Sequence, residues 1–85
     1  MKVEHRLDFV ARCPVNGAPD YYTCIVRTNH LLKVEDIREA IKNATSGEKL
    51  LFQEEITTEL HRLLTAEVET IGWHSGVRTT VICGD

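Results

Sequence analysis

The sequence predicts one small α+β domain, an antiparallel four-stranded sheet with two helices on one face in the order ββααββ. Three observations support this fold class. Segments near both ends of the chain have the alternation or β-branched composition of strands, whereas the middle has helical periodicity. The 85 residues suit a single domain. No linker, repeat or low-complexity segment divides residues 1–85.

The first predicted hairpin joins two strands of different composition. Apolar and charged residues alternate from Val3 to Cys13, which predicts a strand with one buried face. Tyr21–Thr28 is rich in aromatic and β-branched residues and predicts the second strand. Asn16-Gly17 predicts a two-residue turn between them. That register places three pairs on the apolar face, namely Ala11 opposite Tyr22, Phe9 opposite Cys24, and Leu7 opposite Val26.

The same register sets a thiol opposite a carboxyl. Cys13 faces Asp20, with β-carbons roughly 5 Å apart. Arg6 opposite Arg27 counts against this pairing, because like charges repel across a ladder. The prolines beside the turn lack an N–H group, so a splayed loop tip is expected to lengthen the Cys–Asp distance without separating their faces.

Two amphipathic helices follow, and each is defined by regularly spaced apolar residues. The first has Val34, Ile37, Ile41 and Ala44, and it is expected to end at Thr45-Ser46-Gly47. The second has Phe52, Ile56, Leu60, Leu63 and Leu64, with Glu54 and Glu55 in its first turn.

Glu67–His74 and Val77–Cys83 return to strand character around a two-residue turn at Ser75-Gly76. The sheet face away from the helices would carry charges, threonines and apolar residues such as Val10 and Ile25. The outer strands would also be open edges, which proteins usually cover or pair. We therefore expect a homo-oligomer in which sheets from several subunits close into a barrel.

The sequence lacks the usual signals of several classes of protein. The net charge is −3 and the Lys and Arg residues are scattered, unlike the basic tracts of nucleic-acid binders. No signal peptide and no apolar run of roughly 20 residues is present, so a cytoplasmic protein without membrane contact is expected. Cys13, Cys24 and Cys83 lack a Cys-x-x-Cys spacing and are expected to be free thiols. No metal site is expected from the dispersed histidines, which are His5, His30, His61 and His74.

The thiol and carboxyl of the first hairpin have two interpretations. Cys13 and Asp20 could form a catalytic pair. Alternatively, the cysteine is a small packing residue and the aspartate bonds to nearby backbone amides. Cys24 and Cys83, which lie within strands, are expected to pack rather than react.

A motif favours the catalytic interpretation. Residues 13–20, Cys-Pro-Val-Asn-Gly-Ala-Pro-Asp, resemble the Cys-Pro-x-x-Gly-x-Pro-Asp segment of nitrile reductases that act on 7-cyano-7-deazaguanine, the QueF family. Residues 52–55, Phe-Gln-Glu-Glu, resemble that family's Phe-His-Glu-Asp at the start of the second helix. The resemblance implies the tunnelling fold, whose ββααββ unit assembles into oligomeric barrels in stacked rings with active sites at subunit interfaces.

The resemblance also implies residue roles. Cys13 would attack the nitrile carbon to form a covalent thioimide, and Asp20 would move protons at the nitrile nitrogen. Glu54 would hold the edge of the deazaguanine base, although acidic residues also favour a first helical turn through the helix dipole. An ionised Asp20 disfavours a Cys13 thiolate, so either the two share a proton or Asp20 stays protonated until substrate arrives. The other expected substrate-binding residues are Phe52, Gln53 and His74.

The sequence departs from the reductases where they bind NADPH. Their Glu-Ser-Lys-Ser-x-Lys-x-aromatic segment corresponds here to residues 34–41, which lack the lysines and serines. Asp36 and Glu39 are poor hosts for the cofactor's phosphates. Gln53 also replaces the family's histidine. This pattern resembles the QueF-like amidinotransferases of certain archaea, which convert 7-cyano-7-deazaguanine in tRNA to archaeosine. Ammonia would then be the co-substrate, and no redox cofactor would be needed.

Transfer RNA is the least supported of the expected partners, because this chain is acidic and phosphate contacts usually need Lys or Arg. A ring of subunits could collect a local patch of Arg12, Lys33, His74 and Arg78, each of which is also an ordinary solvated residue. Three alternatives stay open: an NADPH-dependent nitrile reductase, a non-catalytic oligomeric purine-binding module, and a pterin enzyme. The last typically uses zinc-binding histidines, and no matching cluster is visible.

Overall fold

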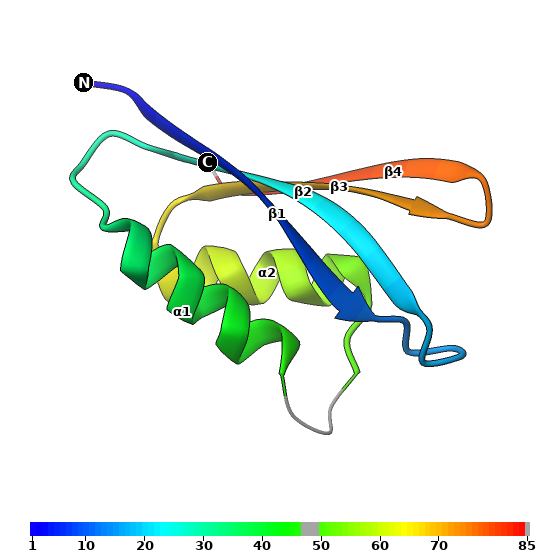
Figure 1. Cartoon of the computed structure of the whole chain (residues 1–85). Helices are drawn as coiled ribbons and strands as arrows, with labels where there is room; N and C mark the ends of the chain where they lie inside the picture. Colours follow the sequence, from blue (N-terminus) through cyan, green and yellow to red (C-terminus); the bar gives the residue numbers. More distant parts are fainter. Residues whose placement is uncertain (47–49, 85) are drawn as a thin grey trace.

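The structure, a computed structural model, describes residues 1–46 and 50–84. Its element order is ββααββ, as predicted, and one antiparallel sheet has the strand order β1-β2-β3-β4. Both helices cover the same face of that sheet, and the other face has no helix (Figure 1). The elements are β1 (Val3–Arg12), β2 (Pro19–Thr28), α1 (Val34–Thr45), α2 (Gln53–Leu64), β3 (Glu67–His74) and β4 (Val77–Cys83).

The core lies between the sheet and the helices, because alternate strand residues and one stripe of each helix turn toward each other. Helix α1 contributes Ile37, Ala40, Ile41 and Ala44, and α2 contributes Ile56, Leu60 and Leu64. The strands contribute Phe9, Ala11, Tyr22, Cys24, Val26 and Val68. Cys24 is fully buried, and burial raises the pKa of its thiol to about 12, consistent with a packing role.

The helix stripes differ from prediction at their ends. Val34, Phe52 and Leu63 are exposed rather than buried. On α2, Gln53 and Thr57 are buried instead, one turn apart on the side that faces the sheet. Ser46 caps the end of α1 as expected, whereas the predicted Gly47 lies outside the described residues.

The predicted register of the first hairpin is wrong by two residues. Phe9 pairs with Tyr22, Leu7 pairs with Cys24, and Ala11 rather than Cys13 pairs with Asp20. A shift of two residues leaves every side chain on its predicted face, whereas a shift of one would reverse them. Cys13 is therefore diagonal to Asp20 on the same face, not directly opposite.

The longer connection between the strands explains this shift. The Cys13 N–H donates to the Ala18 carbonyl at 2.8 Å, and the Gly17 N–H donates to the Cys13 carbonyl at 2.8 Å. Asn16 Oδ1 accepts from the Ala18 N–H at 2.9 Å, and Gly17 adopts a positive φ of 73°. Pro14 fits this loop because it has no N–H to pair. The two-residue turn predicted at Asn16-Gly17 does not form.

The observed register also removes the predicted repulsion. Arg6 pairs with Ile25, and Arg27 pairs with Glu4. The Arg27 guanidinium reaches Glu4 at 3.1 Å, and it also reaches two carboxylates of β3, Glu67 and Glu69, at 3.0 and 2.8 Å. Opposite charges across the ladder thus favour the register that forms.

The second hairpin is as predicted. His74 pairs with Val77 across a two-residue turn. Ser75 and Gly76 both have positive φ angles, 51° and 83°, as the twist of a tight hairpin requires. This turn fixes the end of β3, and with it the backbone of His74.

Candidate functional site

Both hairpin loops and the start of α2 lie at the same end of the sheet (Figure 1). A cavity of about 400 Å³ lies between them. Its lining includes all six residues selected from the sequence, which are Cys13, Asp20, Phe52, Gln53, Glu54 and His74. The structure thus brings together residues that are far apart in the chain.

The backbone of Cys13 is fixed on both sides. Its N–H donates to Ala18 and its carbonyl accepts from Gly17. Cys13 is half-buried and lines the cavity, on the face shared with Asp20. A diagonal pair in an antiparallel ladder has Cα atoms roughly 7–8 Å apart, so a reacting group can lie between the thiol and the carboxyl.

Asp20 lies on β2 and faces His74 of β3. Its carboxyl is largely buried, with 16% of the side chain exposed, and Oδ2 lies 3.7 Å from His74 Nδ1. The Tyr22 ring is 5.8 Å from the His74 ring, centroid to centroid. The side chain of Asp20 is therefore confined between the cavity, Tyr22 and His74.

Tyr22 also lines the cavity, although the strand pattern predicted it only as part of the apolar face. Burial raises its pKa to about 12, with smaller contributions from the charges of Asp20, Cys13 and Glu54 and from a hydrogen bond with Asp20. Its hydroxyl is therefore protonated at neutral pH and available as a donor. The alternation of a strand could have indicated this, because residues 20 and 22 of β2 lie on the same face as each other.

Gly72 makes room for this tyrosine. It pairs with Tyr22 across β2 and β3, and a β-carbon at Gly72 would lie 2.5 Å from the tyrosine ring. A glycine within a strand commonly marks a close approach of this kind. The glycine at position 72 was the one feature of the sequence that indicated this close approach of the Tyr22 ring to β3.

Gln53 is buried, and its amide is fully engaged with the protein. Its Nε2 donates to the carbonyls of Thr70 and Thr79, at 3.1 and 3.0 Å, and lies 3.1 Å from the Thr70 hydroxyl. Its Oε1 is 2.7 Å from His74 Nε2. Gln53 therefore links α2 to β3, β4 and the histidine.

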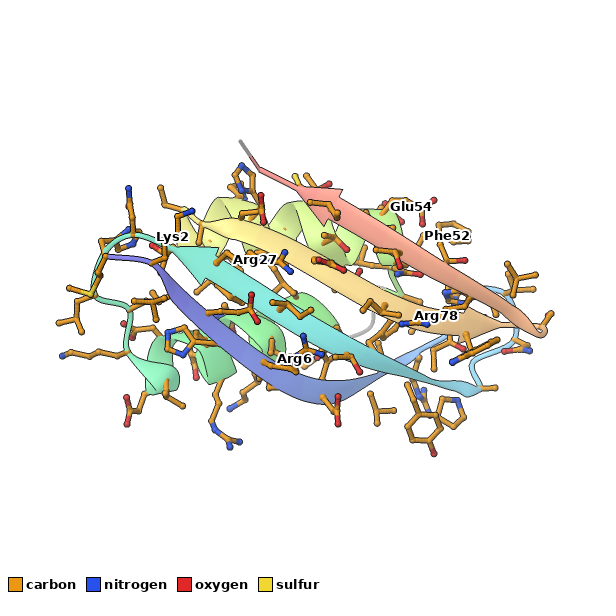
Figure 2. The ribbon with its side chains drawn as sticks, turned by 90° about the horizontal axis from the view of Figure 1, so that it is seen from above. Lys2, Arg6, Arg27, Phe52, Glu54 and Arg78 are labelled. Carbon is orange, nitrogen blue, oxygen red and sulfur yellow. The ribbon has the colours of Figure 1, made fainter. Side chains whose placement is uncertain are left out.

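The two acidic residues at the start of α2 have different surroundings. The Glu55 carboxylate accepts from the Phe52 backbone N–H at 2.9 Å, which supplies the capping bond at this helix end. Glu54 is exposed and lines the cavity. Phe52 and Glu54 project past the β4 edge, whereas Arg6, Arg27 and Arg78 lie over the uncovered sheet face (Figure 2).

The described residues also line cavities elsewhere. A larger cavity of about 650 Å³ lies at the opposite end of the sheet, between Lys2, His30 and His61, and its lining contains no cysteine. Among residues 1–46 and 50–84, no three His, Cys, Asp or Glu side chains are grouped so as to bind a metal ion. No helix in the same ranges is long and apolar enough to cross a membrane.

Comparison with known proteins identifies the fold. No protein-family model matches the chain, and no curated protein does. Among solved structures, the chain is similar to the apo form of an archaeosine synthase QueF-Like. The fold is the tunnelling fold. The TM-score is 0.78 over 96% of this chain and 90% of the other, with 16% sequence identity. At that identity the likeness establishes the architecture, and the chemistry must be argued from the residues themselves.

Proposed function

We propose that this protein is a tRNA-modifying amidinotransferase of the archaeosine synthase type, which acts on the nitrile of 7-cyano-7-deazaguanine through a Cys13 thioimide. The observation that carries the proposal is that Cys13, Asp20 and Glu54 line one cavity at the end of the sheet. Its volume of about 400 Å³ lies within the range of small-molecule sites. The similar solved structure is itself an archaeosine synthase.

Each residue has a role that its chemistry supports. A thiolate is a suitable nucleophile for the electrophilic nitrile carbon, and the nitrile nitrogen gains a proton as the thioimide forms. Asp20, on the same face, is placed to deliver that proton. Glu54 can accept two hydrogen bonds from the N–H and amino groups of a guanine-like base. Phe52, exposed beside Glu54, offers a ring for the base to contact.

Ammonia completes the reaction as co-substrate. It adds to the thioimide carbon, loses a proton, and displaces Cys13 as the amidine forms. Addition of ammonia to a nitrile needs no oxidant or reductant. The first turns of α1, where the reductases carry their NADPH segment, expose Glu35, Asp36 and Glu39 in this structure. The same segment exposes one cation, Arg38, so its net charge is negative. A net negative segment is a poor host for the phosphates of a dinucleotide, which favours the amidinotransferase over the NADPH-dependent reductase.

The assembly we propose is a homo-oligomer whose sheets close into a barrel. The uncovered sheet face exposes large apolar side chains, each with 51–69% of its surface accessible, which are Val10, Tyr21, Trp73 and Ile82. Strands β1 and β4 are edges of the sheet. Phe52 and Glu54, which line the cavity, project past β4 (Figure 2), so we propose that a neighbouring subunit paired with that strand completes the cavity wall.

For tRNA, the basic residues of one subunit come from different parts of the fold. Lys33 precedes α1 and Arg12 ends β1, while Arg78 lies over the uncovered face (Figure 2) and His74 lines the cavity. We propose that neighbouring subunits of the oligomer supply the phosphate contacts.

The test is an intact-protein mass spectrum after incubation with 7-cyano-7-deazaguanine. We expect a mass increase equal to the whole ligand in the wild type and in Cys83→Ala, and none in Cys13→Ala. Ammonium should then release the ligand as the amidine, whereas NADPH should leave the adduct unchanged.

Two other results would each assign a different function to the protein. Conversion of the adduct by NADPH would establish the reductase instead. Binding of the base by folded protein without an adduct, on the free base and on tRNA that carries it, would establish a non-catalytic purine-binding module.

A further inference from the structure

His74 lies beside Asp20 but belongs to a different part of the chain. It is the last residue of β3, and the following turn at Ser75 and Gly76 fixes its backbone. Its Nδ1 is 3.7 Å from Asp20 Oδ2, and about a third of its side chain is exposed to the cavity. The histidine is thus oriented toward the carboxyl that the proposed reaction requires.

The hydrogen bonds of Gln53 determine which imidazole nitrogen carries a proton. The backbone carbonyls of Thr70 and Thr79 can only accept, so the Gln53 amide must direct its NH₂ group toward them. Its oxygen is then the atom that faces His74 Nε2 at 2.7 Å. Because an amide oxygen also only accepts, Nε2 must be the protonated nitrogen.

The consequence concerns the other nitrogen. In the neutral imidazole, Nδ1 has no proton and faces Asp20 with a free lone pair. A single additional proton can therefore reside on either Nδ1 or the Asp20 carboxyl. The titratable groups around the pair are the Tyr22 hydroxyl on β2, the Cys13 thiol and the Glu54 carboxyl at the start of α2. Tyr22 remains protonated at neutral pH because burial raises its pKa to about 12.

We propose that His74 is a positioning residue that shares the Asp20 proton and is held for this purpose by Gln53. This inference rests on the proposed function. It also explains how a thiolate can form beside Asp20, since a protonated His74 offsets the carboxylate charge.

The proton transfers balance without an additional reactant. As the Cys13 sulfur bonds to the nitrile carbon, the thiol proton passes to the Asp20–His74 pair and from there to the nitrile nitrogen. When ammonia bonds to the thioimide carbon, the pair removes a proton from the new nitrogen. The pair gives that proton to the sulfur as the carbon–sulfur bond breaks.

The test uses His74→Gln as the decisive variant. The terminal NH₂ of glutamine can still donate to Gln53 Oε1, so the contact is retained while the titratable group is lost. We expect the rate of adduct formation with 7-cyano-7-deazaguanine to fall by about 10²-fold, the lower end of general acid–base effects. We also expect its dependence on pH between 5 and 8 to flatten.

A purely structural role predicts a different result. An adduct rate within about twofold of the wild type, with the same pH profile, would overturn the proposal for His74. In that case the wild type would still form the adduct, so the proposed function would stand. If neither protein forms the adduct on the free base or on tRNA, the proposed function fails and this inference fails with it.

A second measurement does not require a folded variant or a substrate. Long-range ¹H–¹⁵N spectra of the wild type at pH 8 report the tautomer of each neutral histidine. We expect His74 to carry its proton on Nε2. A proton on Nδ1 would show that Gln53 does not orient the ring as inferred, and would overturn the proposal.

Discussion

Replacing Gly72 with alanine tests the packing that positions the site. The added β-carbon would lie 2.5 and 2.6 Å from two ring carbons of Tyr22 and 3.4 Å from His74 Nε2. The Tyr22 ring cannot easily move, because it is 3% exposed and packs against Phe9 with ring centroids 5.2 Å apart. Overpacking of a filled core costs roughly 1–3 kcal/mol. We expect Gly72→Ala to lower the free energy of unfolding by about 2 kcal/mol, or the melting temperature by roughly 8–16 °C.

The assay is urea unfolding followed by circular dichroism at one fixed protein concentration, since an oligomer's stability depends on concentration. Tyr22→Val provides the matched background, because valine has no δ- or ε-carbon to meet the new β-carbon, whereas the two closest ring atoms of Tyr22 are its Cε1 and Cδ1. In that background we expect Gly72→Ala to lower the free energy of unfolding by less than about 0.5 kcal/mol. Equal costs in the two backgrounds would refute the steric argument, since the effect of Gly72 would then be independent of the ring.

Three further predictions concern the core and the uncovered face. Gln53→Met should lower the free energy of unfolding in urea by about 2–3 kcal/mol, because it leaves two strand carbonyls without a donor. Thr70→Val should lower it by only about 1 kcal/mol. The reverse order would contradict the hydrogen-bond network around Gln53. Burial raises the pKa of Cys24 from 9.0 to about 12. Stability should therefore be full well below pH 9, where Cys24 is protonated in both states, and should fall as the pH rises toward 12. Cys24→Ala should flatten this decline between pH 8 and 10.5, and an unchanged slope would exclude the thiol as its cause. Arg27→Met should destabilise the protein by about 1 kcal/mol or less, and the loss should shrink in 1 M salt; a loss unaffected by salt would indicate packing instead.

The element order and the composition of each face could be predicted because both depend on local periodicity. Alternation in β1 and the 3.6-residue period of α2 each determine which side chains point inward, whatever the elements pack against. The burial of Gln53 and Thr57 was not predicted, since polar residues on a helix ordinarily indicate a solvated face. Their burial becomes favourable only where Thr70 and the Thr79 carbonyl satisfy them.

The register of the first hairpin could not be read from the turn motif alone. Asn16-Gly17 has the signature of a two-residue turn, but the Ala18 N–H bonds to the Asn16 side chain and Gly17 closes a longer loop. The ion pairs of Arg27 with β1 and β3 favour the same register. The register of two strands depends on the combined free energy of the loop contacts and the cross-strand contacts. No single sequence motif contains all of these contacts.

The sequence by itself determined the fold class, the faces of the strands and the set of residues now found around one cavity. Only the tertiary structure decided how those residues meet. Asp20, Gln53 and His74 come from β2, α2 and β3, and their contacts depend on where two hairpins and a helix end relative to one another. Local backbone geometry sets the direction of a side chain, whereas its partner is set by packing between segments that are distant in the chain.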